Sequence, residues 1–359
     1  MHFCVDCKAK RKGSQVMNAY ERVMNTMQGK PVDRVPVFAV LGAYGGKLTG
    51  VDLRTLYSNV EAYVASQRAV EEAFGFDLVL VPFDNSAIAE AFGGEVAWFA
   101  DQAPNLKRPS VSTAAAVLAL PQPDPHRTAR LPFIVESTGK LSAIYRERVP
   151  VFAAVPGPVA IPALILGLEA WLEILLFDEA AAQRLLEFSG EFFVTWANTL
   201  LEAGVTALIV AEGMAAAEIS QRSLFAEQML PHIRAVFSQV HGPMVFHHTG
   251  GRINQVLDLL PGLPGLAGVV VSSKDDLTEA RQRLGPELLL LGNLDNLLFP
   301  TTSADEIRER SLVCLRTAAP AGPFILANSG ADIPMSTPPE NLRAMILASE
   351  AYAVERSPA

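Results

Sequence analysis

Two adjacent histidines, His247 and His248, close an apolar run in the segment VFHHTGGRIN, which spans residues 245–254. A Thr-Gly-Gly turn follows them, and a helix is expected to begin after the turn. Histidine is a frequent metal ligand and acid–base group because its ordinary pKa lies near neutrality. No cysteine or carboxylate stands beside this pair. The segment therefore indicates a chemical site whose remaining groups must come from other parts of the chain.

Polar residues also follow the other apolar runs of the sequence. They are Asp84 and Asn85, Glu212, Thr249, Ser272, Ser273 and Lys274, Asn293 and Asp295, and Asn328, Ser329 and Asp332. In a sheet of parallel strands the carboxyl ends of the strands meet at one face, where active sites lie. We therefore expect these side chains to surround one pocket together with the histidines.

Eight short apolar runs, most of them followed by a helical pattern, predict the scaffold of this pocket. They cover residues 35–41, 77–83, 149–155, 205–211, 243–248, 266–272, 287–293 and 323–328. Nearly continuous apolar strands are typical of a parallel sheet that is covered on both faces. Eight such strands in one chain predict an α/β fold, a (β/α)8 TIM barrel. An open, doubly wound sheet is the alternative, but no G-x-G-x-x-G or Walker loop supports it.

The longest interruption of the pattern runs from Asp84 to Val149, after the second strand, and includes the Pro-rich segment LPQPDPHR. Such a long excursion is expected to form a lid or side wall at the barrel mouth. Helix starts are expected at Asp178 and Ser303, which suit N-cap positions, and at Pro338–Pro339, which suits a first helical turn. We therefore predict a single domain over residues 17–359 with a long insertion after strand 2.

The period of two in a strand separates the neighbouring histidines. His247 and Thr249 are expected to face one side of the sheet, and His248 the other. Only one of the two imidazoles should then face the pocket, while the other hydrogen-bonds to the adjoining helix or loop.

Composition restricts the class of protein. Half of the residues are hydrophobic and the formal net charge is −9, which argues against a nucleic-acid partner. The most apolar stretch, residues 151–168, is interrupted by Pro156, Pro158 and Pro162, so we expect core and loop rather than a membrane helix. A cytoplasmic enzyme is the expected class. Cys4 and Cys7 form a lone C-x-x-C, which we interpret as part of a flexible extension over residues 1–16.

Four segments resemble one known family. They are ERVMNTMQGKPVDRVPVF (21–38), FDNSAIAEAFGGEV (83–96), FHHTGG (246–251) and GADIPMSTPPENLRAMILA (330–348). Over residues 17–355 the chain is similar to the uroporphyrinogen decarboxylase superfamily, and within it to the corrinoid-dependent branch, the methylcobamide:coenzyme M methyltransferases and related enzymes. The resemblance implies a (β/α)8 barrel, in agreement with the strand count.

The resemblance also shows what this chain lacks. Zinc-dependent members carry His-x-Cys-Gly after strand 5 and a further Cys before the TPPEN block, and these three residues bind zinc. Here His247 matches the histidine, whereas the two cysteine positions read Thr249 and Ala331. Thiolates dominate such a site. His247 is thus the only ligand that survives, and bound zinc is expected to be absent or weak.

True uroporphyrinogen decarboxylases differ from this chain in the residues that bind their substrate. After strand 1 they carry Arg-Gln-Ala-Gly-Arg-Tyr, but LGAYGGKLTG offers only Lys47 at that place. An octacarboxylate tetrapyrrole needs several cations. Besides Lys47, the expected pocket contains Lys274 and at most Arg252. Asp84, however, does match an aspartate of the family motif.

The leading hypothesis is a corrinoid-dependent methyltransferase that moves a methyl group between a cobamide, as methylcobalamin or cob(I)alamin, and a small non-thiol substrate. His247 or Glu212 would act as general acid on the leaving group of a methyl ether or ester. Asp84, Asn293 and Asn328 would orient the substrate. The remaining binding candidates are His248, Thr249, Ser272, Asp295 and Asp332.

Two alternatives stay open at this point. One is a decarboxylase of a tetrapyrrole or small acid in which Asp84 stabilises a developing cation. The other is a non-catalytic protein that binds a cobamide or tetrapyrrole. The chain has no cobalamin-binding Asp-x-His-x-x-Gly motif, so a corrinoid would arrive free or on a separate corrinoid protein. Trp98 and Phe99 are candidates for docking such a partner, although core packing is the favoured interpretation.

Overall fold

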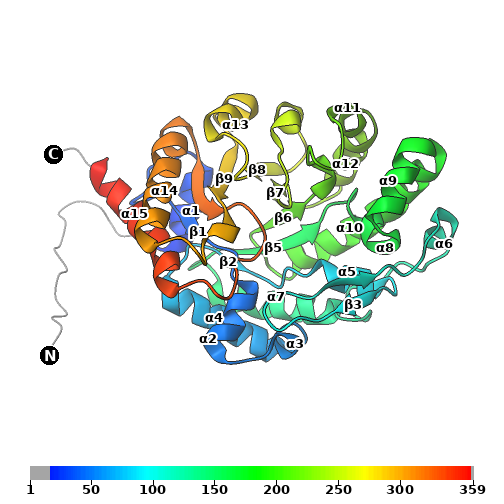
Figure 1. Cartoon of the computed structure of the whole chain (residues 1–359), viewed down its shortest axis with the longest axis horizontal. Helices are drawn as coiled ribbons and strands as arrows, with labels where there is room; N and C mark the ends of the chain where they lie inside the picture. Colours follow the sequence, from blue (N-terminus) through cyan, green and yellow to red (C-terminus); the bar gives the residue numbers. More distant parts are fainter. Residues whose placement is uncertain (1–16, 357–359) are drawn as a thin grey trace.

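The computed structural model describes residues 17–356, so the interpretation of residues 1–16, with Cys4 and Cys7, lies outside the described residues. Eight parallel strands form one curled sheet that helices surround (Figure 1). The strands are β1 (Val37–Phe38), β2 (Val79–Leu80), β5 (Val151–Pro156), β6 (Ala207–Ala211), β7 (Met244–His247), β8 (Leu266–Val270), β9 (Leu289–Leu294) and β10 (Phe324–Asn328). Each predicted apolar run overlaps one of them, and β5 and β9 extend one residue beyond their runs.

The order of the strands confirms the barrel and excludes the doubly wound alternative. From β2 to β10 each strand of this sheet pairs with the sheet's next strand along the chain, β2 with β5 and so on, and β10 pairs with β1. The two edge strands meet where the Asp77 N–H donates to the Val37 carbonyl at 2.8 Å. The Asp77 carboxylate accepts the Val37 N–H in return, at 2.7 Å. One side chain thus completes the pairing between β1 and β2 that two-residue strands leave unfinished.

The alternation of side chains divides the core into two layers. Phe38, Leu80, Ile209 and Ala327 belong to the cluster inside the barrel. Their neighbours along the strands, such as Val210, belong to the larger cluster between the sheet and the helices. Both faces of every strand are therefore apolar, which explains why the sequence shows continuous runs rather than alternation.

Helices follow the strands in the order expected for this fold (Figure 1). The helices around the barrel are α1 (Ala19–Met27), α2 (Gly42–Thr49), α3 (Leu53–Leu56), α4 (Val60–Phe74), α7 (Leu131–Tyr145), α10 (Glu179–Glu202), α12 (Leu230–Phe237), α13 (Leu277–Leu284), α14 (Ala304–Ala318) and α15 (Pro339–Glu355). Short turns are η1 (Gly213–Ala215), α11 (Arg222–Leu224), the π-helical η2 (Phe225–Met229), η3 (Asn254–Leu259), η4 (Asn296–Leu298) and η5 (Ala319–Ala321).

The expected helix starts are confirmed. Asp178 accepts the Ala181 N–H and begins α10, and Ser303 accepts the Glu306 N–H and begins α14. Pro338 and Pro339 open α15. No helix among residues 17–356 has both the length and the apolar character needed to cross a membrane.

The excursion after β2 is folded, and its part before α7 lies at one end of the molecule, on the right in Figure 1. It contains α5 (Asn85–Ala91), a hairpin of β3 (Glu95–Ala97) and β4 (Asn105–Arg108), α6 (Ala114–Leu118) and α7. The hairpin was not anticipated from the sequence. α5 and α6 pack on α8 (Ile161–Leu166), which with α9 (Leu168–Phe177) follows β5. The excursion is therefore a side wall built jointly with the β5 connection.

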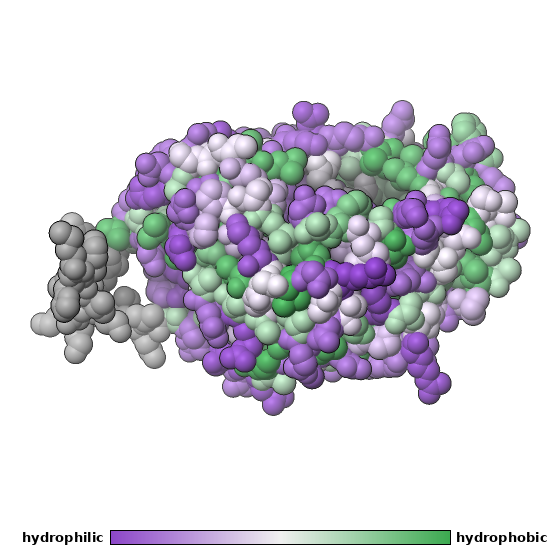
Figure 2. Space-filling view, turned by 60° about the horizontal axis from the view of Figure 1, so that its bottom comes forward, coloured by the Kyte–Doolittle hydropathy of each residue, from purple (hydrophilic) through white to green (hydrophobic). Residues whose placement is uncertain are grey.

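This end of the molecule also exposes apolar side chains. Leu176 and Phe177 at the end of α9 are 57% and 82% exposed. Figure 2 shows hydrophobic residues among polar ones at the same end. The guanidinium groups of Arg54 and Arg130 lie over the ring of Trp98, at 5.3 and 4.8 Å from its centre, and Trp98 is partly buried against the core. Phe99 is 39% exposed.

Candidate functional site

A narrow cavity lies at the carboxyl ends of the strands, and all eight strands contribute to its wall. The lining residues are Phe38, Val40, Leu80, Phe83, Ala154, Ile209, Ala211, His247, Val270, Leu291, Ala327, Asn328, Gly330 and Ala331. Its volume is about 20 Å³, which is room for one or two waters. We call it the mouth cavity.

His247 is the histidine that faces the mouth cavity, as strand alternation requires for one member of the pair. The chain leaves the strand after this residue. The ring of His248 therefore does not point to the opposite face but stacks on His247, with 4.9 Å between ring centres and 7° between planes. The expectation of opposite directions was wrong because it extended the strand by one residue too many.

Backbone hydrogen bonds determine the tautomers of both imidazoles. Nδ1 of His247 accepts the Thr249 N–H at 2.9 Å, and Nδ1 of His248 accepts the Gly250 N–H at 2.8 Å. A nitrogen that accepts such a bond carries no proton, so the proton of each neutral ring is on Nε2. Burial lowers the pKa of His247 to about 4, although the Gly330 carbonyl acts in the opposite direction. Nε2 of His248 is buried without a hydrogen-bond partner.

Thr249 begins the turn that allows this arrangement. Its φ of 55° lies in the left-handed region, which is uncommon for a β-branched residue. Its hydroxyl packs against Gly213, where an added Cβ would lie 2.4 Å from Thr249 Oγ1. The side chain thus contacts η1 and is not part of the mouth cavity wall.

Glu212 is fully buried and does not line the mouth cavity, since its neighbour Ala211 occupies the inward position. Its carboxyl accepts the N–H groups of Val159, at 3.0 Å, and Met214, at 3.2 Å. Gly157 makes room for it, because a Cβ there would lie 2.2 Å from Oε2. Burial raises the pKa of Glu212 to about 8, against the opposing effect of these backbone bonds. The carboxyl is therefore protonated near neutrality.

Asp84 also turns away from the mouth cavity. Its carboxylate caps α5 by accepting the Ser86 N–H at 2.9 Å, and it forms a buried ion pair with Arg130. Arg130 further binds Glu90 at 2.6 Å. Arg130 was missed in the sequence, where its position at the start of α7 gave no hint of a partner 46 residues away.

The remaining predicted polar residues hold loops in place. Asp332 accepts the N–H groups of Gly42, at 2.9 Å, and Ala43, at 3.0 Å, at the start of α2. Burial raises its pKa. Asn328, in the cavity wall, accepts the Val40 N–H at 2.9 Å and donates to the Ala331 carbonyl at 2.9 Å.

Ser272, Asn293 and Asp295 lie at neighbouring strand ends but outside the mouth cavity. The Ser272 hydroxyl accepts the Lys274 N–H at 3.2 Å. The Asn293 amide donates to the Ser272 and Asp275 carbonyls at 2.9 and 3.0 Å. Asp295 caps η4. The structure therefore gathers the predicted residues around the mouth but brings only His247 and Asn328 into the cavity wall.

The residues present do not fit a zinc site of the kind that the resemblance implies. Within residues 17–356 no three His, Cys, Asp or Glu side chains are arranged to hold a metal ion. Ala331 lines the mouth cavity near His247 but offers no ligand atom, and Thr249 points to η1. A site that depends on thiolates cannot be assembled from these groups.

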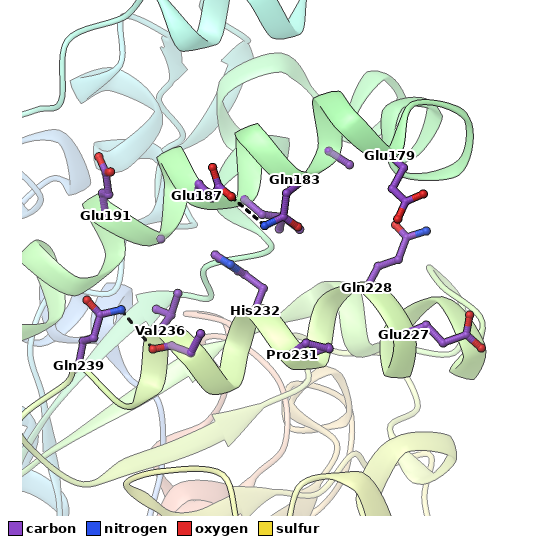
Figure 3. A pocket seen from close by; sticks show the side chains of 14 residues that line it. Glu179, Gln183, Glu187, Glu191, Glu227, Gln228, Pro231, His232, Val236 and Gln239 are labelled. Atoms are coloured by element: carbon purple, nitrogen blue, oxygen red, sulfur yellow. Dashed lines mark hydrogen bonds between the residues drawn. The ribbon is translucent and has the colours of Figure 1, made fainter.

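A larger cavity, of about 580 Å³, lies on the outside of the barrel between α10 and α12 (Figure 3). Four glutamates line it: Glu179, Glu187, Glu191 and Glu227. His232 points from α12 towards α10, and Gly190 provides the space for its ring. This groove shares no lining residue with the mouth cavity, so we assign it no part in the chemistry there.

Comparison with known proteins agrees with this geometry. The family model described as "Uroporphyrinogen decarboxylase (URO-D)" matches residues 18–352. The methylcobamide:CoM methyltransferase MtaA of Methanosarcina barkeri is 24% identical over 345 residues, which cover 92% of this chain and 97% of that protein. The uroporphyrinogen decarboxylase of Anaeromyxobacter sp. (strain Fw109-5) is 27% identical over 353 residues, covering 92% and 99%. A solved methyltransferase from Methanosarcina mazei shares the fold, with a TM-score of 0.83 at 21% identity, covering 93% and 99%.

Proposed function

Because the chain belongs to the uroporphyrinogen decarboxylase family, we propose that it is an enzyme that moves a methyl group between a cobamide and a small non-thiol substrate. The observation that carries this proposal is His247, the one titratable side chain in the wall of a largely apolar cavity, whose proton lies on Nε2 because Nδ1 accepts the Thr249 N–H. Two positions that bind zinc in thiol-activating members are Thr249 and Ala331 here. A thiol acceptor would therefore lack the group that activates it.

The role of His247 in this reaction is to donate a hydrogen bond from Nε2–H to the oxygen that leaves the methyl group. The C–O bond would break with its electron pair left on that oxygen, and a reduced cobamide, when bound, would supply the electron pair that takes up the methyl group. A donor aimed at the developing charge stabilises the transition state. His247 is then a neutral donor rather than the general acid expected from the sequence, because Nδ1 is occupied by the Thr249 N–H. The proton that finally neutralises the oxygen comes from water.

Glu212 and Asp84 take supporting roles in this proposal. Glu212 joins the loops after β5 and β6, and through its own N–H, which donates to the His247 carbonyl at 2.9 Å, it also helps to place the histidine. Asp84 anchors the excursion through Arg130. Neither carboxyl faces the mouth cavity. We therefore propose them as positioning residues, and the catalytic role falls on His247.

Decarboxylation of a tetrapyrrole is the alternative, and the distribution of cations argues against it. Lys47 donates to the Met335 carbonyl at 2.7 Å, Lys274 lies 3.8 Å from Glu218, and neither lines the mouth cavity. A substrate with many carboxylates would find no cation in the wall. Turnover of uroporphyrinogen that is sensitive to Asp84→Asn would favour the decarboxylase; no turnover would exclude it.

The cobamide would reach the mouth free or on a separate corrinoid protein, since this chain has no motif of its own for holding it. We propose an anaerobic absorbance titration with methylcobalamin and cob(I)alamin as the test. A saturable spectral shift followed by methyl exchange with a donor supports the enzyme. A shift without any exchange identifies a binding protein, and a flat titration well above micromolar concentration refutes the corrinoid assignment.

Three variants test the role of His247 in the same assay. His247→Asn keeps an acceptor for the Thr249 N–H but places no donor at the Nε2 position, so methyl transfer should fall about 10²- to 10³-fold. His247→Gln can present an N–H near the Nε2 position and should recover part of that loss. The control is His241→Ala, an exposed histidine just before β7, at the other end of the strand from the mouth. Equal activity of the Asn and Gln variants would remove the donor role.

A further inference from the structure

We propose that the protein binds a phosphate group, of free phosphate or of a small phosphate monoester, in a second cavity at the amino ends of β1 and β10. This cavity has a volume of about 560 Å³ and lies between the segment before β1 (26–36), the segment before β10 (319–324) and the end of α15. We call it the basal cavity. It shares no lining residue with the mouth cavity, so binding there is independent of the proposed methyl transfer.

The charged side chains in the wall of the basal cavity are mostly cationic. Lys30, Arg34 and Arg356 line it, and Asp33 is its single carboxylate. Asp33 and Arg34 each form an ion pair at 2.6 Å with a residue outside the wall. Lys30 and Arg356 are exposed and form no ion pair with any other residue between 17 and 356. In a chain with a formal net charge of −9, this wall thus keeps two uncompensated positive charges.

A third uncompensated cation lies directly behind this wall. Arg281 is only 7% exposed, and its guanidinium donates to the carbonyls of Gly285, Leu288 and Pro323 at 3.1, 2.7 and 2.7 Å. Its Nε is buried without a hydrogen-bond partner, and no carboxylate of the described chain lies within ion-pairing distance of it. A buried charge without a counter-charge is unfavourable, so an anion placed nearby would be stabilised.

Gly322 brings the basal cavity close to this buried charge. Gly322 and Pro323 both line the cavity. A Cβ added to Gly322 would lie 2.9 Å from Cζ of Arg281 and 3.0 Å from Nη1, and the φ of 150° at this position favours glycine. The guanidinium therefore packs against the backbone that forms the cavity wall. Its field reaches the cavity through a thin layer of protein rather than through water, where it would be screened.

A phosphate group suits these charges better than a carboxylate does. A phosphate monoester carries a charge of about −1.5 to −2 near neutrality, and its oxygens accept charge-assisted hydrogen bonds from lysine and arginine. Bound beside Gly322, the phosphate would accept from Lys30 and Arg356 and lie in the field of Arg281. A carboxylate brings a single charge and would leave more of the positive charge uncompensated.

The remainder of the wall leaves room for the body of an ester. Pro31, Pro320 and Pro323 line it together with Phe324 and Tyr352, whose side chains are buried. These surfaces are aliphatic and aromatic, and a volume of about 560 Å³ falls within the usual range of small-molecule sites. The charged residues would hold the phosphate, and the apolar residues would contact the rest of a monoester.

Calorimetric titration of the full chain with three probes tests the ligand class. The probes are inorganic phosphate, phenyl phosphate and benzoate, which has the same ring but a single charge. Both phosphates should bind, and benzoate should bind at least about tenfold more weakly than phenyl phosphate, the usual worth of one hydrogen bond between charged groups. Tighter binding of phenyl phosphate than of inorganic phosphate identifies a monoester as the ligand, and the reverse order identifies free phosphate. Failure of both phosphates to bind at millimolar concentration, or benzoate binding as tight as that of phenyl phosphate, overturns the proposal.

Two substitutions of exposed residues locate the site. Lys30→Gln and Arg356→Gln each remove one positive charge from the wall and should weaken phosphate binding about five- to tenfold. Arg184→Gln is the matched control, because Arg184 is an exposed arginine on α10 outside the wall and without an ion pair among the described residues. Unchanged binding in the first two variants, or an equal loss in Arg184→Gln, would mean that phosphate does not bind in the basal cavity.

Arg281→Met tests the contribution of the buried charge. Saturating phosphate should raise the midpoint of thermal unfolding of the unchanged protein, because it binds the folded state. The rise should be smaller in Arg281→Met, and Arg281→Lys, which keeps the charge, should recover part of it. An undiminished rise in Arg281→Met contradicts the role of this guanidinium. If the Arg281 variants do not fold, the variants of Lys30 and Arg356 decide, since neither of these exposed side chains belongs to the core.

Discussion

The two ends of the barrel bury charge in different ways. At the amino ends of the strands, Asp77 binds Arg22 and Arg34 at 2.6 Å each, and Asp33 also binds Arg22 at 2.6 Å. At the carboxyl ends Asp84 pairs with Arg130, but Glu212 and Asp332 are held by backbone N–H groups, with no cation within ion-pairing distance of either one among the described residues. Ion pairs join distant segments permanently. Burial raises the pKa of Glu212 and of Asp332, which favours the uncharged form of both acids.

The largest effect on stability is expected from the amino end. Asp77→Ala removes two ion pairs and the acceptor of the Val37 N–H, and it leaves Arg22 and Arg34 without one of their partners. Breaking a buried pair from one side typically lowers the free energy of unfolding by about 3–5 kcal/mol. Urea unfolding measures this loss, and Asp77→Asn, which keeps an acceptor, should lose less. A loss below about 1 kcal/mol would mean that the network does not close the barrel.

The next effect concerns the pH dependence of stability at the mouth. The folded chain keeps the Glu212 proton up to about pH 8, whereas the ordinary value for the unfolded chain is 4.5. The folded state thus binds more protons between these values, and the free energy of unfolding falls as pH rises through this window. The fall contributed by Glu212 is up to about 5 kcal/mol.

Glu212→Gln removes the titrating group and should flatten that dependence. Unfolding free energies of both proteins from pH 5 to pH 8.5 measure the difference in slope. If the two curves remain parallel throughout this range, Glu212 is ionised in the folded protein. The two ends of the barrel would then not differ in the way described for buried acids.

A smaller effect on stability is expected at Asp332, at the rim that the carboxyl ends of the strands form. Asp332→Ala leaves the N–H groups of Gly42 and Ala43 without their acceptor at the start of α2. Loss of such a cap lowers the free energy of unfolding by about 1–2 kcal/mol. Thermal unfolding checks this value. A loss as large as that of Asp77→Ala would show that the rim contributes as much as the amino end.

The smallest effect is expected for an exposed pair on α14. Arg310 and Glu306 lie 2.6 Å apart with about half of each side chain exposed. Pairs of this kind contribute about 0.3–0.5 kcal/mol. Arg310→Ala should therefore change the midpoint of urea unfolding barely more than the error of measurement. A larger change would indicate that the contribution of an ion pair to the stability of this protein depends on its charges alone and not on its burial.

The strands, the barrel and the helix starts were predictable because each depends on a local pattern. Continuous apolar runs identify buried parallel strands, and Asp178 and Ser303 cap helices through bonds to residues three positions away. The β3–β4 hairpin was not predictable, since its strands are only three and four residues long and exposed or half-buried. The prediction that His248 faces the opposite side of the sheet was wrong for a similar reason, because β7 ends one residue earlier than the apolar run suggests.

The site was predictable as a ring of residues but not as a cavity. The sequence by itself determined which residues follow the strands and that one of the two histidines faces inward, and the family resemblance pointed to His247 as that histidine and to Thr249 and Ala331 at the thiolate positions. Only the tertiary structure decided that Asp84 faces Arg130 and that Glu212 faces two backbone N–H groups. Arg130 lies 46 residues from Asp84 and Val159 lies 53 residues from Glu212, and a polar side chain turns to whichever partner satisfies it when water is excluded. No local pattern encodes that choice, so the apolar, uncharged character of the mouth emerged only when the loops were brought together.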